Sequence, residues 1–371
     1  MARPLTAQIS LDALRHNYQL AQHWSASAQT LAVIKADAYG HGAVQAAQAL
    51  QDLAPAFAVA CIEEAETLYQ AGIQRPILLL EGFFSAEELP LILARGYWMV
   101  IHSHWQLRDL MAFCQAQGVQ NLPPIWLKVD TGMHRLGFEP QALDSVIQTL
   151  TQQLARPSLT LMTHLARADE LDQPMTTQQC STLLQHPAIA HYPKSLANSA
   201  GIMHWPTTHQ DWTRPGILLY GASPLPLEHP KTQALRPVMQ LTSRLISVRE
   251  IAAGEAVGYG GRFIATQPTR IGVVACGYGD GYPRQAKEGT PVWIRGQKVP
   301  LAGRVSMDLL TVDLTQVPSA QAGDPVELWG QHLAVNEVAQ HCDTISYTLL
   351  TGLLPRVSRD YVSVLPESTE S

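Results

Sequence analysis

The sequence predicts an α/β protein: an N-terminal (β/α)8 barrel followed by a mainly β C-terminal domain. Short apolar runs alternate with longer amphipathic stretches from about residue 30 to 220, which is typical of repeated βα units. The runs number about eight, as a closed barrel of parallel strands requires. They lie at 31–35, 57–62, 76–80, 97–101, 124–129, 159–164, 194–199 and 216–220.

The stretches between the runs predict helices over 43–53, 62–72 and 85–96, of which the last two end at glycines. An open, doubly wound sheet is the competing fold. We favour the barrel on the number of strands, and because no GxGxxG motif follows an early strand to mark a dinucleotide-binding sheet.

After about residue 235 the sequence pattern changes to short runs rich in β-branched residues, which are separated by Gly and Pro. This pattern predicts a second, mainly β domain. A chain of 371 residues also exceeds the size at which one hydrophobic core stops growing. We therefore expect a barrel domain over 8–234 and a β domain over 235–371 that also takes in residues 1–7. The boundary falls in the Pro-rich stretch 224–237.

Composition and charge argue against several classes of function. The net charge is only −6 and charges of both signs are interspersed, so no basic surface for nucleic acid is expected. No apolar run reaches the roughly 18 residues of a membrane span, and the N-terminus lacks a signal-peptide pattern. The 5 cysteines are scattered, which predicts free thiols, no metal site and a cytoplasmic location. An enzyme acting on a small molecule is the default expectation.

Several predicted strands end in reactive side chains, namely Lys35, Lys128, His164, and Asn198 with Ser199. Taken singly, each would more often be a solvated or hydrogen-bonded structural residue. Because the carboxyl ends of barrel strands form the active face, however, these side chains should lie close together. A lysine after an apolar strand is partly desolvated, which lowers its pKa and frees its amine to form a Schiff base.

The glycines that follow the first of these lysines, Gly40 and Gly42, lie beside a predicted helix start whose N–H groups could hold a phosphate. This segment, VIKADAYGHGA, is the first of several motifs. The others are LKVDTGMHRLGF (127–138), TRPGILLYGASP (213–224), GYGGRF (258–263), CGYGDGYPR (276–284), AGRVSMDLLTVDL (302–314) and SYTLLTGLLPRV (346–357). In this order, and over nearly the whole chain, they closely resemble the motifs of the alanine racemase family.

The resemblance implies an enzyme that uses pyridoxal 5'-phosphate and two bases to interconvert L-alanine and D-alanine, either for peptidoglycan or for alanine breakdown. It implies that Lys35 carries the cofactor and acts on one face of the substrate α-carbon, while Tyr259 acts on the other. A tyrosine with a pKa of about 10 needs supporting neighbours to act as a base, and His164 and Arg214 match that role. Arg214 is also implied to face the pyridine nitrogen, which a guanidinium leaves unprotonated.

The same resemblance implies the remaining contacts. The cofactor would be held by Lys35, Tyr39, Asn198, Ser199, Arg214, Gly216, Ile217 and Tyr347. The substrate would meet Arg135, Met307, Tyr278 and Asp308.

The resemblance also implies a modification and a partner. Lys128 matches a lysine that is often carbamylated in the family, and its neighbour Arg135 would otherwise repel it. Because the C-terminal-domain groups come from the partner subunit in the family, a head-to-tail homodimer with shared active sites is implied. The visible departure from the family pattern is Ser306, where some relatives carry Cys.

Other functions remain open on the residues. An amino-acid decarboxylase or a racemase for serine or a broader substrate set would share this architecture, although Tyr347 argues for a narrow pocket. A non-catalytic pyridoxal-phosphate carrier would lack residues 236–371, and a purely structural barrel would need none of the motifs.

Overall fold

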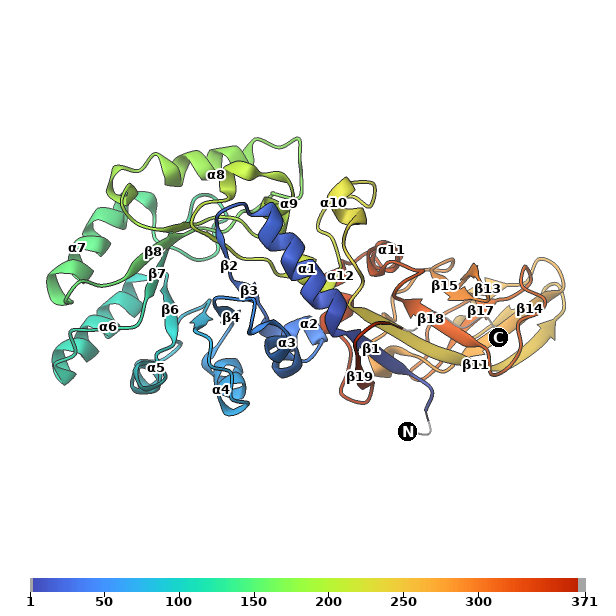
Figure 1. The fold of residues 1–371 in the computed structure, drawn as a ribbon. Helices are drawn as coiled ribbons and strands as arrows, with labels where there is room; N and C mark the ends of the chain where they lie inside the picture. Colours follow the sequence, from blue (N-terminus) through green and yellow to red (C-terminus); the bar gives the residue numbers. More distant parts are fainter. Residues whose placement is uncertain (1–2, 366–371) are drawn as a thin grey trace.

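Parallel strands alternate with helices in the first lobe of the structure, a computed structural model that describes residues 3–365 (Figure 1). All neighbouring strands of this lobe pair in parallel. They are β2 (Gln29–Thr30), β3 (Ala32–Val33), β4 (Phe57–Val59), β5 (Ile77–Leu79), β6 (Trp98–Ile101), β7 (Ile125–Lys128), β8 (Leu159–Met162), β9 (Lys194–Ser195) and β10 (Trp212–Thr213).

The strands close into a barrel because β2 and β3 are two parts of one strand, separated only by Leu31. β2 pairs with β10, and β3 pairs with β4. The Leu31 N–H donates to the carbonyl of Thr213 at 2.9 Å, which continues the β10 pairing across the break. The predicted barrel is therefore confirmed.

Helices cover the outside of the barrel strands, whose own residues are almost all buried, as in parallel sheets covered on both faces. The helices of this lobe are α1 (Leu11–Trp24), α2 (Lys35–Gly40), α3 (Ala43–Leu50), α4 (Ile62–Gln70), α5 (Leu89–Arg95), α6 (His104–Gln117), α7 (Leu143–Gln153), α8 (Met175–Leu184) and α9 (Ser199–His204). The three predicted helices correspond to α3, α4 and α5. As expected, α5 ends at Gly96 in the left-handed conformation.

The predicted eighth strand over 216–220 is wrong. These residues form the 3-10 helix η5 (Ile217–Tyr220), and the eighth strand is β10, which comes before it. The run is buried throughout, and an apolar run without alternation does not distinguish a buried strand from a buried helical turn.

The second lobe is mainly β, as predicted, and within the described residues its main sheet has 8 strands. They are β1 (Thr6–Ser10), β11 (Met239–Ile251), β14 (Thr269–Val274), β15 (Pro291–Ile294), β16 (Gln297–Pro300), β17 (Leu310–Asp313), β18 (Pro325–Trp329) and β19 (Ser358–Val362). A small hairpin pairs β12 (Ala256–Val257) with β13 (Phe263–Ile264), and two short helices follow β18, α11 (Val335–His341) and α12 (Ser346–Thr351).

The chain starts in the second lobe before it enters the barrel. β1 lies between β11, to which it is antiparallel, and β19, to which it is parallel. α10 (Pro230–Gln233) lies in the connection back from the barrel. The domain limits 8–234 and 235–371 remain predictions, and residues 1, 2 and 366–371 fall outside the described part of the chain.

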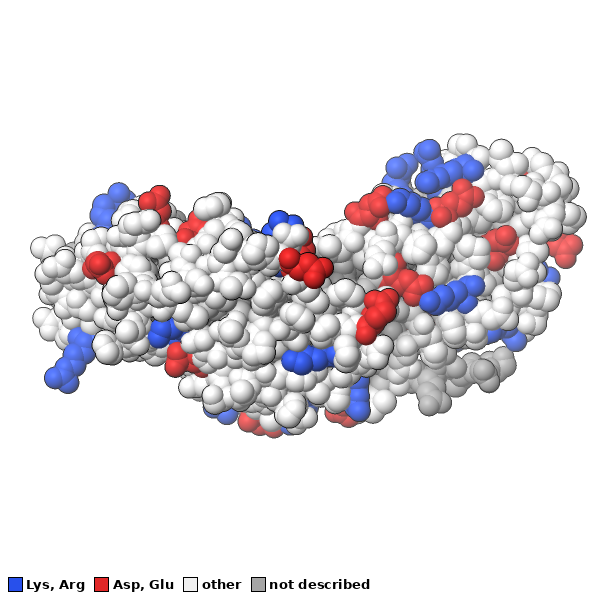
Figure 2. Space-filling view, turned by 90° about the horizontal axis from the view of Figure 1, so that it is seen from above, with Lys and Arg blue, Asp and Glu red and all other residues white. Residues whose placement is uncertain are grey.

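The two lobes meet where α12 packs against α2. On the face seen in Figure 2, basic and acidic side chains are interspersed over both lobes, and the outline is hollowed between them. No helix formed by residues 3–365 is long and apolar enough to cross a membrane.

Candidate active site

The chain makes a strained turn directly after β3. α2 contains Ala36, Asp37, Ala38 and Tyr39, all of which have φ between +51° and +55°. The left-handed conformation costs an L-residue about 1–2 kcal/mol. Strain of this kind persists only where the surroundings impose it, and it clusters at functional sites. The turn begins at Lys35, so the strain lies beside the predicted cofactor lysine.

Carboxylates hold this turn in place. Glu64 in α4 accepts hydrogen bonds from the N–H groups of Ala36 and Ala60, both at 2.7 Å. The Asp37 side chain accepts from the Ala43 N–H at 2.8 Å. Sequence reasoning missed Glu64, because an acidic residue in the first turn of a helix is usually explained by the helix dipole.

The glycines of the same segment, Gly40 and Gly42, have structural roles. The Gly42 N–H donates to the Asp37 carbonyl at 2.9 Å, and the next N–H is bound by the Asp37 side chain. A Cβ on Gly40 would lie 2.2 Å from the Leu350 carbonyl oxygen. The expectation that the helix start after these glycines holds a phosphate is therefore wrong for its first two N–H groups, which are already bonded.

Four cationic side chains gather at the carboxyl ends of the barrel strands. Lys35 follows β3, Lys128 ends β7, Arg135 lies in the loop after β7, and Arg214 follows β10. Burial, followed by the positive charges of Arg214, Arg135 and Lys35, lowers the pKa of Lys128 to about 8. Glu81 opposes this shift with its negative charge. We call these four residues the cation cluster.

His164 follows β8 and faces the same cluster. Burial is the main cause that lowers the pKa of His164 well below its usual value, and the charges of Arg214, Lys128, Arg135 and Lys35 lower it further. The ring is therefore neutral at pH 7. It can donate or accept a hydrogen bond there but cannot supply the positive charge that would favour a phenolate.

Arg214 is buried and held by oxygen atoms of the barrel. Its Nη1 donates to the Ser195 carbonyl at 2.8 Å and to the Ser195 hydroxyl at 2.5 Å, while Nη2 donates to the Thr163 carbonyl at 2.6 Å. Burial lowers the pKa of Arg214 to about 10, so the side chain stays protonated at pH 7. These contacts fix the guanidinium without neutralising it.

A cradle of hydroxyl and backbone groups lies next to Arg214. The Ser199 hydroxyl accepts from the Gly216 N–H at 3.0 Å and is within 3.4 Å of the Leu218 nitrogen. A Cβ on Gly216 would lie 2.4 Å from the Tyr39 hydroxyl oxygen. The Tyr39 ring lies 6.0 Å from the ring of Tyr347, which comes from the second lobe.

Three further implied cofactor residues are Tyr39, Asn198 and Ile217. Burial raises the pKa of Tyr39 to about 12, so its hydroxyl remains a donor. Asn198 caps α9, since its side-chain oxygen accepts from the Gly201 N–H at 3.0 Å. Ile217 is buried at the start of η5.

The second-lobe candidates lie apart from the cation cluster. Tyr259 opens η6 (Tyr259–Gly261), between β12 and β13, and its side chain is 72% exposed. Figure 1 shows β13 in the second lobe, away from the barrel strands. Tyr278 begins η7 (Tyr278–Asp280), and Met307, 55% exposed, precedes Asp308 in the loop before β17. One chain thus presents two separate halves of the predicted site.

Comparisons with known proteins agree on both lobes. The family model "Alanine racemase, N-terminal domain" matches residues 9–224, and "Alanine racemase, C-terminal domain" matches residues 238–361. The chain belongs to the alanine racemase family. The alanine racemase of Chromohalobacter salexigens is 56% identical over 362 residues, which cover 97% of this chain and 98% of that protein. The predicted family and the enzyme class, an isomerase, are confirmed.

Solved alanine racemase structures share the architecture. The biosynthetic alanine racemase of Pseudomonas aeruginosa has a TM-score of 0.92 at 46% identity, with 97% of this chain and 99% of that chain covered. The alanine racemase of Bartonella henselae, described with covalently bound pyridoxal phosphate, has a TM-score of 0.89 at 32% identity, with 97% and 99% covered. The alanine racemase family depends on pyridoxal phosphate, so the predicted cofactor is confirmed.

Proposed function

We propose that this chain interconverts L-alanine and D-alanine, with pyridoxal 5'-phosphate held at Lys35 and with proton-transfer groups on both faces of the substrate α-carbon. The observation that carries the proposal is the cation cluster, whose positive charges, together with burial, lower the pKa values of Lys128 and His164 at the mouth of the barrel. Such a cluster needs anions to balance it. The phosphate of the cofactor and the carboxylate of alanine are anions of that kind.

The residues beside the cluster fit this cofactor. Because Gly216 has no side chain, the Tyr39 hydroxyl can lie close to its main chain, whose N–H donates to the Ser199 hydroxyl. Hydroxyl and backbone N–H groups can hold a phosphate there without a cationic loop. We assign Tyr39, Ser199, Gly216, Ile217 and Tyr347 to the phosphate end. When bound, the cofactor withdraws electrons from the α-carbon and so makes its proton acidic.

Each remaining residue has a separate task in this proposal. Lys35 and Tyr259 each remove a proton from the α-carbon or return one to it, and they act on opposite faces. Arg214 faces the cofactor ring and keeps its own proton, while neutral His164 acts as a hydrogen-bond partner. Arg135 binds the substrate carboxylate through its planar fork.

The second lobe would complete the site of a second copy. We assign the main-chain N–H of Met307 to the substrate carboxylate, and Tyr278 and Asp308 to the access route. Exposed apolar side chains on this lobe, Tyr259 and Met307 among them, indicate a surface that another subunit covers. We therefore propose a head-to-tail homodimer in which each active site takes Lys35 from one chain and Tyr259 from the other.

The cysteines support a proposal for the compartment. All 5 are free thiols in the structure, as expected in a reducing compartment. We propose that the protein works in the cytoplasm.

Optical rotation and isotope exchange test the proposed activity. The purified protein is incubated with L-alanine, and rotation should fall to zero as D-alanine forms. In deuterated water, the label should enter the α-carbon together with inversion. Activity on serine but not alanine would point to a different racemase, and release of carbon dioxide would point to a decarboxylase. Label entering without inversion would contradict the two-base mechanism.

Gly216→Ala should weaken cofactor binding by at least about tenfold, because the added methyl collides with the Tyr39 hydroxyl. The backbone at this position has φ of −118° and ψ of −92°, and the added Cβ meets the Tyr39 side chain, so the melting temperature of the variant is measured together with its affinity. Titration of cofactor-free protein with pyridoxal phosphate measures the affinity. Unchanged affinity would remove Gly216 from the phosphate site.

Lys128 is proposed to carry a carbamate. With a pKa of about 8, about a tenth of its amine is neutral at pH 7 and can react with carbon dioxide. The product is an anion beside Arg135 and Arg214, which offsets their repulsion. Uptake of 13C-labelled bicarbonate, followed by NMR, should reach one label per chain and should rise as the pH is raised toward 8.

Lys128→Met should abolish this uptake. Lys231→Met is the matched control, because Lys231 is also partly buried and burial lowers its pKa, but it lies outside the cluster. A fully active enzyme whose Lys128 is shown by mass spectrometry to be unmodified would contradict the carbamate.

A further inference from the structure

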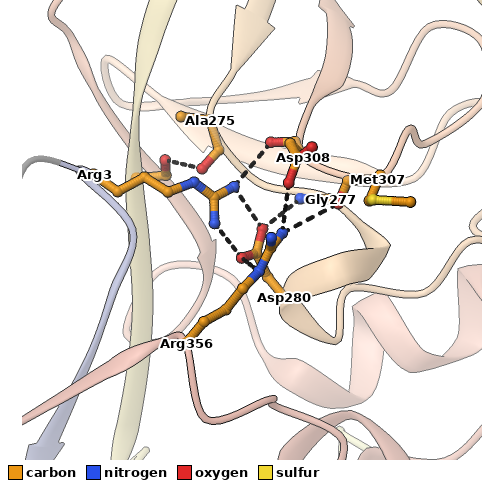
Figure 3. Close-up of polar contacts among 8 residues, drawn as sticks. Arg3, Ala275, Gly277, Asp280, Met307, Asp308 and Arg356 are labelled. Carbon is orange, nitrogen blue, oxygen red and sulfur yellow. Dashed lines mark hydrogen bonds and ion pairs between the residues drawn. The ribbon is translucent and has the colours of Figure 1, made fainter.

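A charge network of Arg3, Arg356, Asp280 and Asp308 connects two loops of the second lobe (Figure 3). One loop carries Tyr278 and the other carries Met307. At the centre of the network, fully buried Asp280 binds the guanidinium groups of both Arg3 and Arg356. Burial raises the pKa of Asp280, but the hydrogen bonds from Arg3, the Gly277 N–H and Arg356 outweigh it, so the pKa lies below its usual range. The carboxylate is thus charged and doubly paired at neutral pH.

The two arginines join the loops to each other. Arg356 contacts Asp280 at 2.7 Å, donates to the Asp308 side chain at 2.8 Å and lies 3.3 Å from the Met307 carbonyl oxygen. Arg3 donates to Asp280 at 2.9 Å and to the Asp308 carbonyl at 3.0 Å. Each guanidinium therefore links the loop that carries Tyr278 to the loop that carries Met307.

The main chains of the loops also pair directly. The Tyr278 N–H donates to the Ser306 carbonyl at 3.0 Å, and the Gly279 N–H donates to the Met307 carbonyl at 2.8 Å. A Cβ on Gly277 would lie 2.4 Å from the Met307 carbonyl oxygen, so only glycine permits this approach. The loops consequently move as one unit.

The arginines anchor this unit to the main sheet. Arg3 precedes β1, and Arg356 precedes β19, and these two strands pair in parallel. Asp280, at the centre of the network, is fully buried, while Met307 is more than half exposed. The exposed side that carries Met307 is the one that the proposed dimer turns toward the partner's barrel.

We propose that Arg356 and Arg3 are positioning residues for the substrate: through Asp280 and the Met307 carbonyl, they fix the Met307 main chain and the Tyr278 ring that complete the partner's active site. This inference rests on the proposed shared active site. Its physical basis is that the substrate carboxylate loses a charge-assisted hydrogen bond when the main-chain N–H that binds it is misplaced.

Arg356→Met is the first test. We expect the KM for alanine to rise about tenfold, as for the loss of one charge-assisted hydrogen bond, with kcat changed less than about threefold. The absorbance of the bound cofactor and the dimer mass should be unchanged. An unchanged KM, or a loss of kcat together with dissociation of the dimer, would overturn the inference.

Arg295→Met is the matched control. Arg295 forms an ion pair of the same kind with Asp324 in the same lobe, through Nε at 2.5 Å and Nη2 at 2.8 Å. Its loss should affect thermal stability to a similar degree and leave the KM alone. An equal rise in KM in this control would mean that general loosening of the lobe explains the effect. Arg3→Met gives a second, independent variant near the chain end, where folding is least at risk, and should also raise the KM.

Mixed dimers decide which active site the network serves. Chains with Lys35→Ala and chains with Tyr259→Phe form hybrids that contain one complete site, built from Lys35 of one chain and Tyr259 of the other. Arg356→Met should raise the KM of this site when it is placed on the Lys35→Ala chain and not when it is placed on the Tyr259→Phe chain. The opposite pattern would overturn the inference. Inactive hybrids without any Arg356 substitution would instead contradict the shared site itself.

Discussion

Lys35→Ala is expected to reduce racemase activity by about four orders of magnitude, because the substitution removes both the covalent attachment of the cofactor and one of the two proton-transfer groups. The strained turn that follows Lys35 holds this lysine within the cation cluster, after β3, whereas Lys128, the other amine of the cluster, ends β7. Activity is measured by optical rotation, and cofactor attachment by borohydride reduction followed by peptide mass spectrometry.

Lys194→Ala is the control for this experiment. Lys194 also belongs to a barrel strand, but it is the first residue of β9, at the amino end, and its Nζ donates to the Tyr192 carbonyl at 2.9 Å. Its removal should leave activity and cofactor attachment intact. Reduction that fixed the cofactor to Lys128 in the unmodified enzyme would show that the assignment of Lys35 is wrong.

Tyr259→Phe is expected to reduce kcat by about 10²–10⁴-fold, the usual contribution of a general acid or base. The ring is retained and only the hydroxyl is lost, and the exposed position makes the substitution harmless to the fold of a single chain. Because Lys35 still acts on its own face, exchange of the α-proton with deuterated water should persist for one enantiomer of alanine. Exchange that continued equally for both enantiomers would exclude Tyr259 as the second base.

Mixing the two inactive variants tests the dimer. If each site takes Lys35 and Tyr259 from different chains, half of the randomly assembled dimers are hybrids, and each hybrid has one complete site of two. Activity should then recover to about a quarter of the wild-type value. Recovery requires exchange of subunits, so samples mixed without prior dissociation serve as the control. No recovery after dissociation and reassembly would place both residues in the site of one chain.

The sequence alone was sufficient for the barrel because its strands are covered on both faces and must be apolar along their whole length. Seven of the apolar runs therefore coincide with β3 to β9. The same rule failed at 216–220, since full burial removes the alternation that separates strand from helix. Burial therefore explains both why seven strands were predicted correctly and why the eighth was not.

The candidate site was predictable from motifs, but its chemistry was not. The resemblance pointed to Lys35, Lys128 and Arg214, which are far apart along the chain, while barrel closure brings them into one cluster. The lowered pKa of Lys128 depends on burial and on charges nearby in space, which no local pattern encodes. The structure adds that the His164 ring is neutral, so any support that it gives is a hydrogen bond and not a positive charge.

By itself, the sequence determined the order of the elements, the lysine at the end of the first barrel strand, and the change to a β domain near residue 235. Only the tertiary structure decided that the turn after Lys35 is left-handed, that Glu64 holds it, and that Arg3 and Arg356 meet at Asp280. It also placed Tyr259 in the other lobe from Lys35. The physical reason is that a hydrophobic pattern can be read from residues that are neighbours in the sequence. Backbone strain and charge pairing depend instead on groups that are distant in the sequence and that folding brings together.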